Sequence, residues 1–215
     1  MLAAQPAQLN PRLSEVVIRP LGDDSFGLAH MMRNRAKIPA KPVPRIDGKP
    51  DFSGVWVSAG DPFPEQAELL PWAAAIQKER DDNLGKDHPH NHCLPGSPPV
   101  PIASVPRIAK FVQTRTLLVI LFEDVPGFRQ VFLDGRGHPA NFDPSWMGHS
   151  VGRWDGDTLV IDTVGFNDQS WIGGSFPHTA MMRMTERYRR ADYGHMEVSA
   201  TFEDPGTLVK PLHMI

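Results

Sequence analysis

The sequence predicts a mainly β protein in which antiparallel strands form a closed or nearly closed barrel. From residue 108 onward, short runs rich in Val, Ile, Leu and Phe alternate with turn residues, a pattern typical of strands. The links between these runs are short and contain no helical crossover, so neighbouring strands are expected to pair antiparallel. About nine such strands with few helices favour a barrel, because closure removes exposed sheet edges.

The composition excludes several classes of protein. The 215-residue chain has 22 Lys and Arg residues against 25 Asp and Glu, a net charge of −3, which provides no basic surface for nucleic acid. No apolar run approaches the roughly 18 residues of a membrane span. The first residues lack the basic and apolar regions of a signal peptide, so we favour the cytoplasm; a secreted or periplasmic location would require a processed start. The single cysteine, Cys93, excludes an internal disulfide.

Residues 1–50 predict an irregular arm that precedes the barrel. The stretch lacks sustained periodicity, and its prolines between residues 39 and 50 favour an extended chain over a helix. A short helix near residues 25–35 and, alternatively, a partly mobile tail both agree with this composition. Residues 51–215 are then expected to form a single barrel domain.

The best helix candidate covers residues 69–82. Pro71 suits the first turn, alanines dominate the middle, and Leu69, Trp72, Ala73 and Ile76 share one face. A loop rich in Pro and His follows at residues 85–106. The expected strands are Ser53–Ser58, Ile108–Thr114, Thr116–Phe122, Phe128–Leu133, Gly148–Trp154, Thr158–Val164, Met181–Arg189, His195–Phe202 and a last segment from Thr207.

The strongest turn signal places a histidine opposite a carboxylate. If Asp155 and Gly156 form a two-residue hairpin loop, Trp154 faces Asp157, and His149 faces Asp162 on one face of the hairpin. Asp162 could then fix the tautomer of His149 and raise its pKa, as a general base requires. Two alternatives stay open: the pair is a contact on the wet outer face, or a bulged three-residue loop breaks it.

A second hairpin, Met182–Arg189 with His195–Phe202, predicts a buried carboxylate. Alternation directs Glu186 inward with Met184 and Tyr188, where an unpaired carboxylate would be costly. Arg129 on a neighbouring strand is a candidate partner. Glu186 could therefore act as an acid or base with a raised pKa, or form an ion pair with Arg129 that stabilises the barrel.

The remaining histidines suggest weaker sites. His178 follows a proline near a strand mouth, where it could serve as an acid or base at the rim of a cavity or simply be a surface residue. His88, His90 and His92 alternate in an extended segment and could share a metal ion, although the Pro-rich surroundings suit a solvated loop. No nucleotide-binding or hydrolase motif is present, so no cofactor is expected.

Two resemblances add to this interpretation. Asp51-Phe-Ser-Gly-Val-Trp56 resembles the Gly-x-Trp opening of lipocalin-type (calycin) barrels, in which the Trp plugs the closed end. Phe128–Arg136, Pro144–Asp168 and Met184–Arg190 resemble a bacterial, often secreted family of uncharacterised β-rich proteins, over roughly residues 47 to 212. The resemblance implies no particular activity. The His-Pro-His-Asn-His run and His149, where an aromatic is common in that family, are departures that would mark a specialised member.

The sequence therefore predicts a calycin-like barrel that acts on a small apolar or aromatic molecule. As a cofactor-free lyase, isomerase, cyclase or hydratase, it would use His149 as general base, Asp162 to orient it, and Glu186 and His178 as acids or bases. Arg129 would anchor the substrate, with Tyr188, Met184 and Trp146 in contact with it. The alternatives are a lipocalin-like carrier without catalysis and a metal-dependent enzyme using His88, His90 and His92. Each of these three possibilities is compatible with a homo-oligomer.

Overall fold

The structure is a computed structural model and describes residues 14–19, 41–59, 66–95, 108–123, 127–141, 143–172 and 175–214. One sheet dominates, with ten strands in the order β1-β4-β5-β6-β7-β8-β9-β10-β11-β12. Their bounds are β1 (Ser14–Arg19), β4 (Gly54–Ala59), β5 (Ile108–Gln113), β6 (Leu117–Phe122), β7 (Phe128–Phe132), β8 (His149–Asp155), β9 (Thr158–Val164), β10 (Arg183–Arg190), β11 (His195–Glu203) and β12 (Leu212–Met214).

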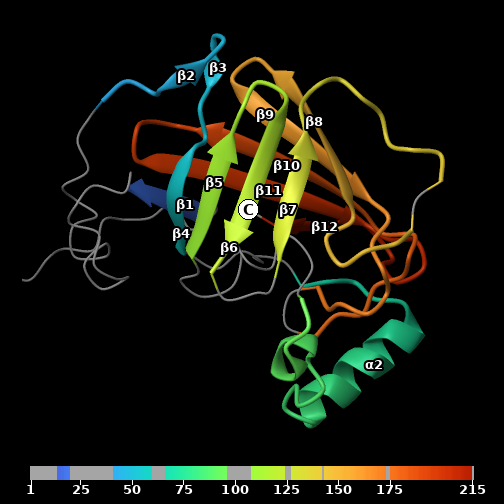
Figure 1. The fold of residues 1–215 in the computed structure, drawn as a ribbon. Helices are drawn as coiled ribbons and strands as arrows, with labels where there is room; N and C mark the ends of the chain where they lie inside the picture. Colours follow the sequence, from blue (N-terminus) through green and yellow to red (C-terminus); the bar gives the residue numbers. More distant parts are fainter. Residues whose placement is uncertain are drawn as a thin grey trace, which may run out of the picture.

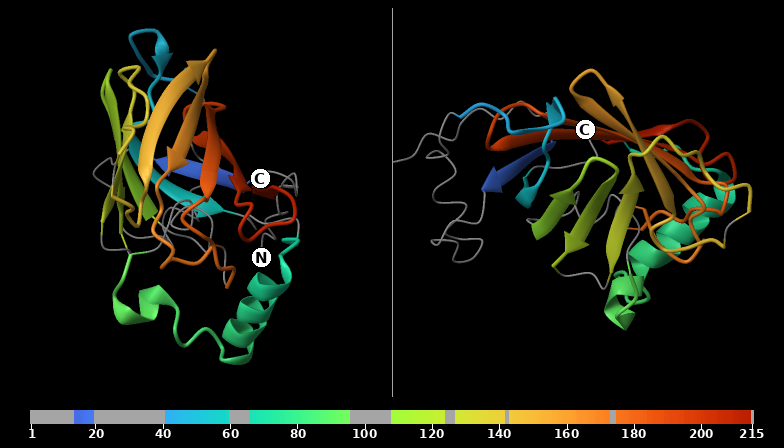
Figure 2. Two further views of the ribbon diagram at one scale, coloured as in Figure 1. Left: turned by 90° about the vertical axis from the view of Figure 1, so that its right-hand side faces the viewer. Right: turned by 45° about the horizontal axis from the view of Figure 1, so that its top comes forward.

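The sheet curls into a barrel-like shape, as Figures 1 and 2 show. β1 pairs with both β4 and β11, so the hydrogen-bonded order returns toward its own start. The mainly β prediction is therefore confirmed, and closure of this kind leaves few unpaired edges. β1 comes from the predicted arm, so this part of the arm contributes to the sheet. The helix expected near residues 25–35 lies outside the described residues.

The prediction that all neighbouring strands pair antiparallel is wrong at one position. β7 and β8 run parallel, and their pairing covers only Val131 with Ser150 and Phe132 with Val151. The connection through residues 133–148 is long enough to carry the chain back past the sheet, which a parallel pair requires and a tight turn forbids. Figure 1 shows this connection as the yellow loop beside β7 and β8.

The predicted register of the β8–β9 hairpin is also wrong. Asp155 pairs with Thr158, so Gly156 and Asp157 form the turn, one residue later than expected. Gly156 has a φ of +61°, and a primed turn needs a positive φ at its first central position, where glycine costs least. Compared with the predicted pairing, each residue of β8 therefore lies opposite a residue two positions later in β9. His149 and Asp162 remain on one face, but His149 lies opposite Val164.

Inward-facing side chains form one continuous core. Along β10 and β11 burial alternates as the pattern predicts, with Met184, Glu186 and Tyr188 inside and Phe202, Ala200 and Val198 opposite them. Trp56 is 1% exposed, and its Nε1 donates to the carbonyl of Phe52 at 2.8 Å. The guanidinium of Arg190 lies 5.4 Å from the centre of the Trp56 ring. This tryptophan is therefore held in one place by packing and by a polar contact.

The helix predicted at residues 69–82 is confirmed as α2 (Pro71–Asp82), which lies beyond one end of the sheet. The amide of Leu70 donates to Thr207 and the indole of Trp72 donates to Gly206, which attaches the start of α2 to the loop before β12. Arg80 stacks on Trp171 at 4.0 Å. A short 3-10 helix, η2 (Pro89–His92), follows.

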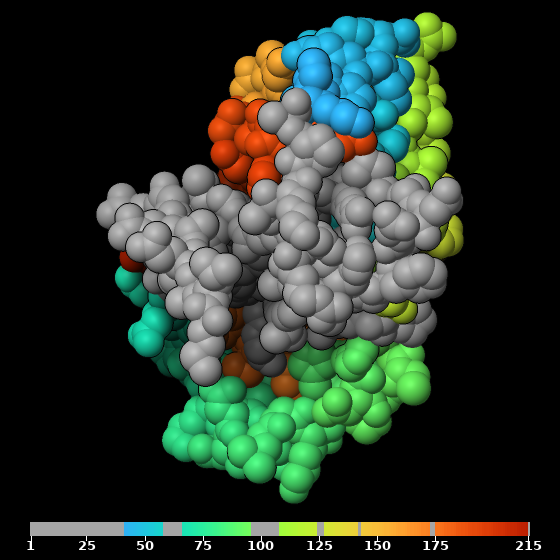
Figure 3. Space-filling view, turned by 90° about the vertical axis from the view of Figure 1, so that its left-hand side faces the viewer, coloured from blue at the N-terminus to red at the C-terminus, as the bar shows by residue number. Residues whose placement is uncertain are grey.

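A small hairpin of β2 (Arg45–Ile46) and β3 (Lys49–Pro50) lies at the opposite end of the molecule from α2, as the blue and green segments in Figure 3 show. The helices within the described ranges are all too short or too polar to cross a membrane.

Gly152 on β8 tests how tightly the core is packed. A Cβ at this position would meet Leu133 Cδ2 at 2.5 Å and Val131 Cγ1 at 3.1 Å. We expect Gly152→Ala to lower the free energy of unfolding by about 1–3 kcal/mol, measured by urea denaturation. Gly137→Ala is the matched control, because no atom lies within 4 Å of its added Cβ and its stability should change little. Equal effects of the two substitutions would contradict this account.

Candidate functional site

The predicted site residues lie on opposite faces of the sheet. Four of them, Arg129, Met184, Glu186 and Tyr188, point into the core and are 1% exposed or less. His149 and Asp162 lie on the outer face of the β8–β9 hairpin, and Trp146 lies in the loop before β8. His178 is buried in the connection between β9 and β10. The structure thus separates the inner carboxylate from the outer histidine.

The inner residues form one closed polar cluster around Arg129. Its guanidinium makes a double ion pair with Glu186, including a 3.0 Å hydrogen bond from Nη1 to Oε1. It also donates from Nε to Ser150 at 3.0 Å and from Nη2 to Thr163 at 2.7 Å. The Tyr188 hydroxyl donates to Glu186 at 2.9 Å. The expected pairing of Arg129 with Glu186 is confirmed, and every charge in the cluster has partners.

This cluster ties four consecutive strands together. Arg129 belongs to β7, Ser150 to β8, Thr163 to β9, and Glu186 to β10. The cluster therefore bridges the short parallel seam between β7 and β8, where few backbone hydrogen bonds are available. Burial raises the pKa of Tyr188, and the neighbouring Glu186 carboxylate adds to the effect, so the phenol stays protonated. The cluster has almost no exposed surface, and its contacts join the four strands.

On the outer face, a chain of hydrogen bonds runs from His149 to Arg183. His149 Nδ1 lies 2.9 Å from His138 Nδ1, and His138 Nε2 lies 3.2 Å from Asp162 Oδ2. Arg183 closes the chain with a two-pronged contact to Asp162, at 2.7 and 2.6 Å. The predicted direct pair of His149 and Asp162 is therefore wrong, because His138 lies between them.

The electrostatics of this chain favour a neutral His149. Partial burial lowers the pKa of His149, and repulsion from Arg136, and from His138 when that ring is protonated, lowers it further. Burial alone would raise the pKa of Asp162, but hydrogen bonds from Arg183 and His138 hold that pKa below its ordinary value. Asp162 is thus an anion fixed in position, and His149 is a base at neutral pH.

His149 also lines a groove on the outer face at the β7–β8 seam. The groove has a volume of about 460 Å³ and a largely apolar lining. Phe128, which is 55% exposed, and Trp146 form its aromatic walls, and Phe132 stacks on the imidazole of His149 at 5.3 Å. The other lining residues are Pro95, Gly127, Gln130, Ser145, Met147, Gly148 and Ser150. Of the predicted site residues, His149 and Trp146 therefore share a pocket.

Gly148 holds the loop that carries Trp146 close to β9. Its φ is +61°, and an added Cβ would meet the Val164 carbonyl oxygen at 2.7 Å and Thr163 Cγ2 at 2.9 Å. Ser145 donates its amide to Gly165 at 2.9 Å, which anchors the other end of the loop. Only glycine fits the position, because any other residue would be strained and would collide with the backbone.

His178 is not at the rim of a cavity. It is 3% exposed, its Nε2 lies 2.7 Å from the hydroxyl of Ser170, and its Nδ1 lies 3.1 Å from the carbonyl of Thr179. Burial lowers the pKa of His178, which keeps the ring neutral. The contacts tie the connection between β9 and β10 together.

The three alternating histidines do not converge on a point. His88 packs edge-on against Trp171 at 4.8 Å, and its Nδ1 accepts from the amide of His90. The rings of His88 and His90 are 6.5 Å apart. Among the residues placed by the structure, no three side chains of His, Cys, Asp or Glu form a group that could hold a metal ion.

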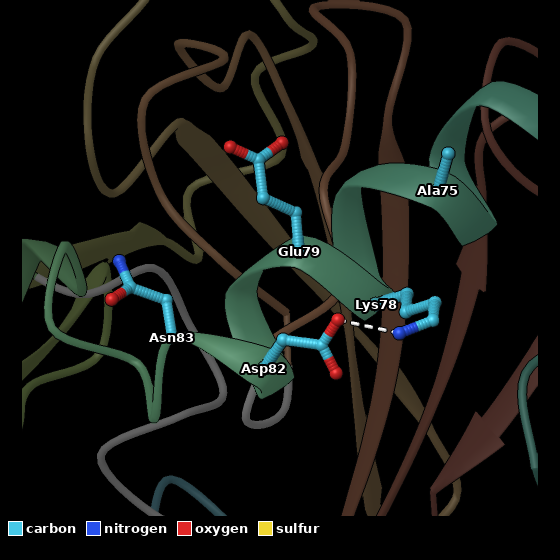
Figure 4. Close-up of a pocket in the computed structure, with 5 residues that line it drawn as sticks. All are labelled: Ala75, Lys78, Glu79, Asp82 and Asn83. Carbon is cyan, nitrogen blue, oxygen red and sulfur yellow. Dashed lines mark hydrogen bonds and ion pairs between the residues drawn. The ribbon is translucent and has the colours of Figure 1, made fainter.

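A shallow hollow also follows the solvent side of α2 (Figure 4). Lys78 forms an ion pair with Asp82 there at 2.5 Å, and Glu79 projects away from that pair. Ala75 and Asn83 complete the lining. An exposed pair one helical turn apart is an ordinary feature of a solvated helix, so this hollow suggests no chemistry.

The sequence interpretation missed His138 and Arg183. His138 lies in the long connection between β7 and β8, and nothing in its local pattern indicates which strand it approaches. Arg183 shares the outward face of β10 with other arginines, so alternation alone could not single it out. The Asp162–Arg183 contact follows from the register of β9 against β10, in which Asp162 is opposite Thr185.

Comparison with protein-family models, with curated proteins and with solved structures gave no match. The site must therefore be interpreted from its own chemistry.

The inner cluster makes a testable prediction about stability. Glu186→Ala removes the carboxylate and leaves Arg129 charged and buried, so we expect the free energy of unfolding to fall by about 3–5 kcal/mol in urea denaturation. Asp82→Ala, which breaks the exposed pair on α2, should cost less than about 1 kcal/mol. A Glu186→Ala variant as stable as the Asp82→Ala control would disprove the stabilising role.

The outer chain makes a prediction about protonation. His138→Gln removes a ring whose protonated form lowers the pKa of His149, so that pKa should rise toward its ordinary value while burial still holds it below. Titration of the imidazole signals by NMR measures the change. His213→Gln, on β12, should leave the His149 titration unaltered. An unchanged or lower pKa of His149 in His138→Gln would show that the two rings do not interact.

Proposed function

We propose that the protein is a cofactor-free enzyme that moves a proton on a small apolar or aromatic molecule bound in the outer groove. A lyase or isomerase reaction fits this chemistry best. One observation carries the proposal. The imidazole of His149 lines an apolar groove, and hydrogen bonds through His138 link it to Asp162 and Arg183. An oriented base beside a desolvating surface is the arrangement that general base catalysis requires.

The chain provides a route for the proton. His149 would accept a substrate proton at Nε2 and pass its Nδ1 proton to His138, whose Nε2–H donates to Asp162. The positive charge would then lie on His138, next to the carboxylate of Asp162. Arg183 keeps Asp162 ionised and oriented, so the relay is restored when the proton returns to the product.

The groove selects the class of substrate. Phe128, Phe132 and Trp146 offer aromatic surfaces for stacking, while Gln130 offers a hydrogen-bonding amide. The two nearby ion pairs, Arg136 with Asp134 and Arg183 with Asp162, each have balanced charge. A neutral, planar molecule with a weakly acidic proton fits this lining better than a highly charged one.

A carrier without catalysis is the second candidate, and one observation favours it. The inward carboxylate Glu186, which a barrel enzyme of calycin type would present to its ligand, is closed into the ion pair with Arg129. We also propose that the chain is related to calycin barrels. The buried Trp56 near the start of the domain supports it.

A chromogenic probe tests the enzyme proposal. In 5-nitrobenzisoxazole a base removes the ring C–H proton, the N–O bond breaks, and a coloured nitrophenolate forms without any cofactor. We expect turnover above buffer that falls about 100-fold or more in His149→Gln and less in His138→Gln. The rate should rise with pH with a midpoint below the ordinary histidine pKa of about 6.5, because the neutral ring is the base and the pKa of His149 is lowered.

His213→Gln is the matched control and should turn over the probe at the unmodified rate. Indole, which has no comparable acidic C–H bond, should inhibit competitively and perturb Trp146 fluorescence. Binding of indole without turnover of the probe would favour the carrier. Turnover that survives His149→Gln would rule out this site.

A further inference from the structure

The outer face of β5, β6 and β7 is unusually apolar for a surface. Seen across the three strands, Lys110, Leu121 and Phe128 form one row, and Val112, Val119 and Gln130 form the next. Val112 and Leu121 are each 41% exposed and Phe128 is 55% exposed. The outward residues, named here the β5–β7 face, are Ile108, Lys110, Val112, Leu117, Val119, Leu121, Phe128, Gln130 and Phe132.

The outer face of β9, β10 and β11, together with the end of β8, has the opposite character. There Arg183 pairs with Asp162, Arg187 with Asp155 and Arg189 with Glu197, at 2.6 to 2.7 Å. One side of the curled sheet is therefore covered by ion pairs, while the other side is covered by aliphatic and aromatic groups. A contiguous apolar patch beside a charged surface marks a place where another surface binds.

β6 shows the same feature within a single strand. Leu118 and Ile120 point into the core with no exposed surface, while Leu117, Val119 and Leu121 point outward. A strand that is apolar on both faces is typical of one covered on both sides. The sequence of β6 is therefore typical of a strand that is buried on both faces, although one of its faces is on the surface of the chain.

Two opposite charges at the rim of the β5–β7 face indicate what covers it. Lys110 lies opposite Leu121, and the amide of Glu123 donates to the carbonyl of Ile108, so both charges lie at the same end of the face. Neither side chain forms an ion pair with another described residue. In a two-fold dimer each residue meets the partner's equivalent patch, which requires the patch to be complementary to itself.

We propose that the β5–β7 face is the contact between two copies of this chain. A two-fold axis that runs along the strands between β5 and β6 brings Lys110 of each copy near Glu123 of the other at one end of the contact, and the apolar rows of the two copies pack against each other along the rest of it. Phe128 belongs both to this face and to the groove beside His149. A second copy therefore forms an additional wall of that groove and shields it from water.

A charge swap tests the contact. We expect the unmodified chain to have twice the 23.9 kDa monomer mass in sedimentation equilibrium over a dilution series. Lys110→Glu or Glu123→Lys should each weaken the dimer about tenfold or more, because two like-charge pairs result. The double variant reverses both charges and should restore association to nearly the original strength.

Further variants separate packing from folding. Leu121→Asp should give a folded monomer by circular dichroism and sedimentation, whereas Ser199→Asp on the outer face of β11 should leave the dimer intact. A monomer at every concentration would overturn the proposal, as would a double swap that associates no better than the single reversals. The readout is mass and does not involve turnover, so it is independent of the proposed enzyme activity.

Discussion

The buried ion pair of Arg129 and Glu186 is the interaction on which the rest of the structure depends. Two ionised groups inside an apolar core are tolerated only when their hydrogen-bonding capacity is met, and Ser150, Thr163 and Tyr188 meet it here. The cluster reaches from β7 to β10 across the seam where the sheet is weakest. It replaces backbone hydrogen bonds that the short parallel pairing of β7 and β8 does not provide.

The same seam explains why the candidate site lies outside the barrel. β8 begins only at His149, so the first half of β7 is flanked by the loop that carries Trp146 and Met147 in place of a strand. A groove forms where the strand is missing. Ser150, fixed from the inside by Arg129, immediately follows His149, whose ring lies on the outer face. The inner cluster thus positions the outer histidine through Ser150, which belongs to the cluster and also lines the groove.

The direction of several site residues could be predicted from the sequence because it depends on the alternation of side chains along a strand. The inward direction of Glu186 and its pairing with Arg129 follow from a period of two and from the cost of an unpaired carboxylate. The prediction that His149 and Asp162 share a face is correct although the predicted turn is wrong, because the actual register of β8 against β9 differs from the predicted one by two residues. His138 could not be found in the same way. Its position depends on the path of a loop, which no periodic pattern describes.

The sequence by itself determined the mainly β class of fold, the helix at residues 71–82, the strands from residue 54 onward and the alternation of the core residues, since each depends on local spacing of apolar residues and turn formers. The tertiary structure decided the parallel seam, the insertion of His138 between His149 and Asp162, and the groove on the outer face. These depend on where a long connection returns to the sheet. That path is set by contacts between residues far apart in the chain, such as those of Gly148 with Val164 and of Arg129 with Glu186.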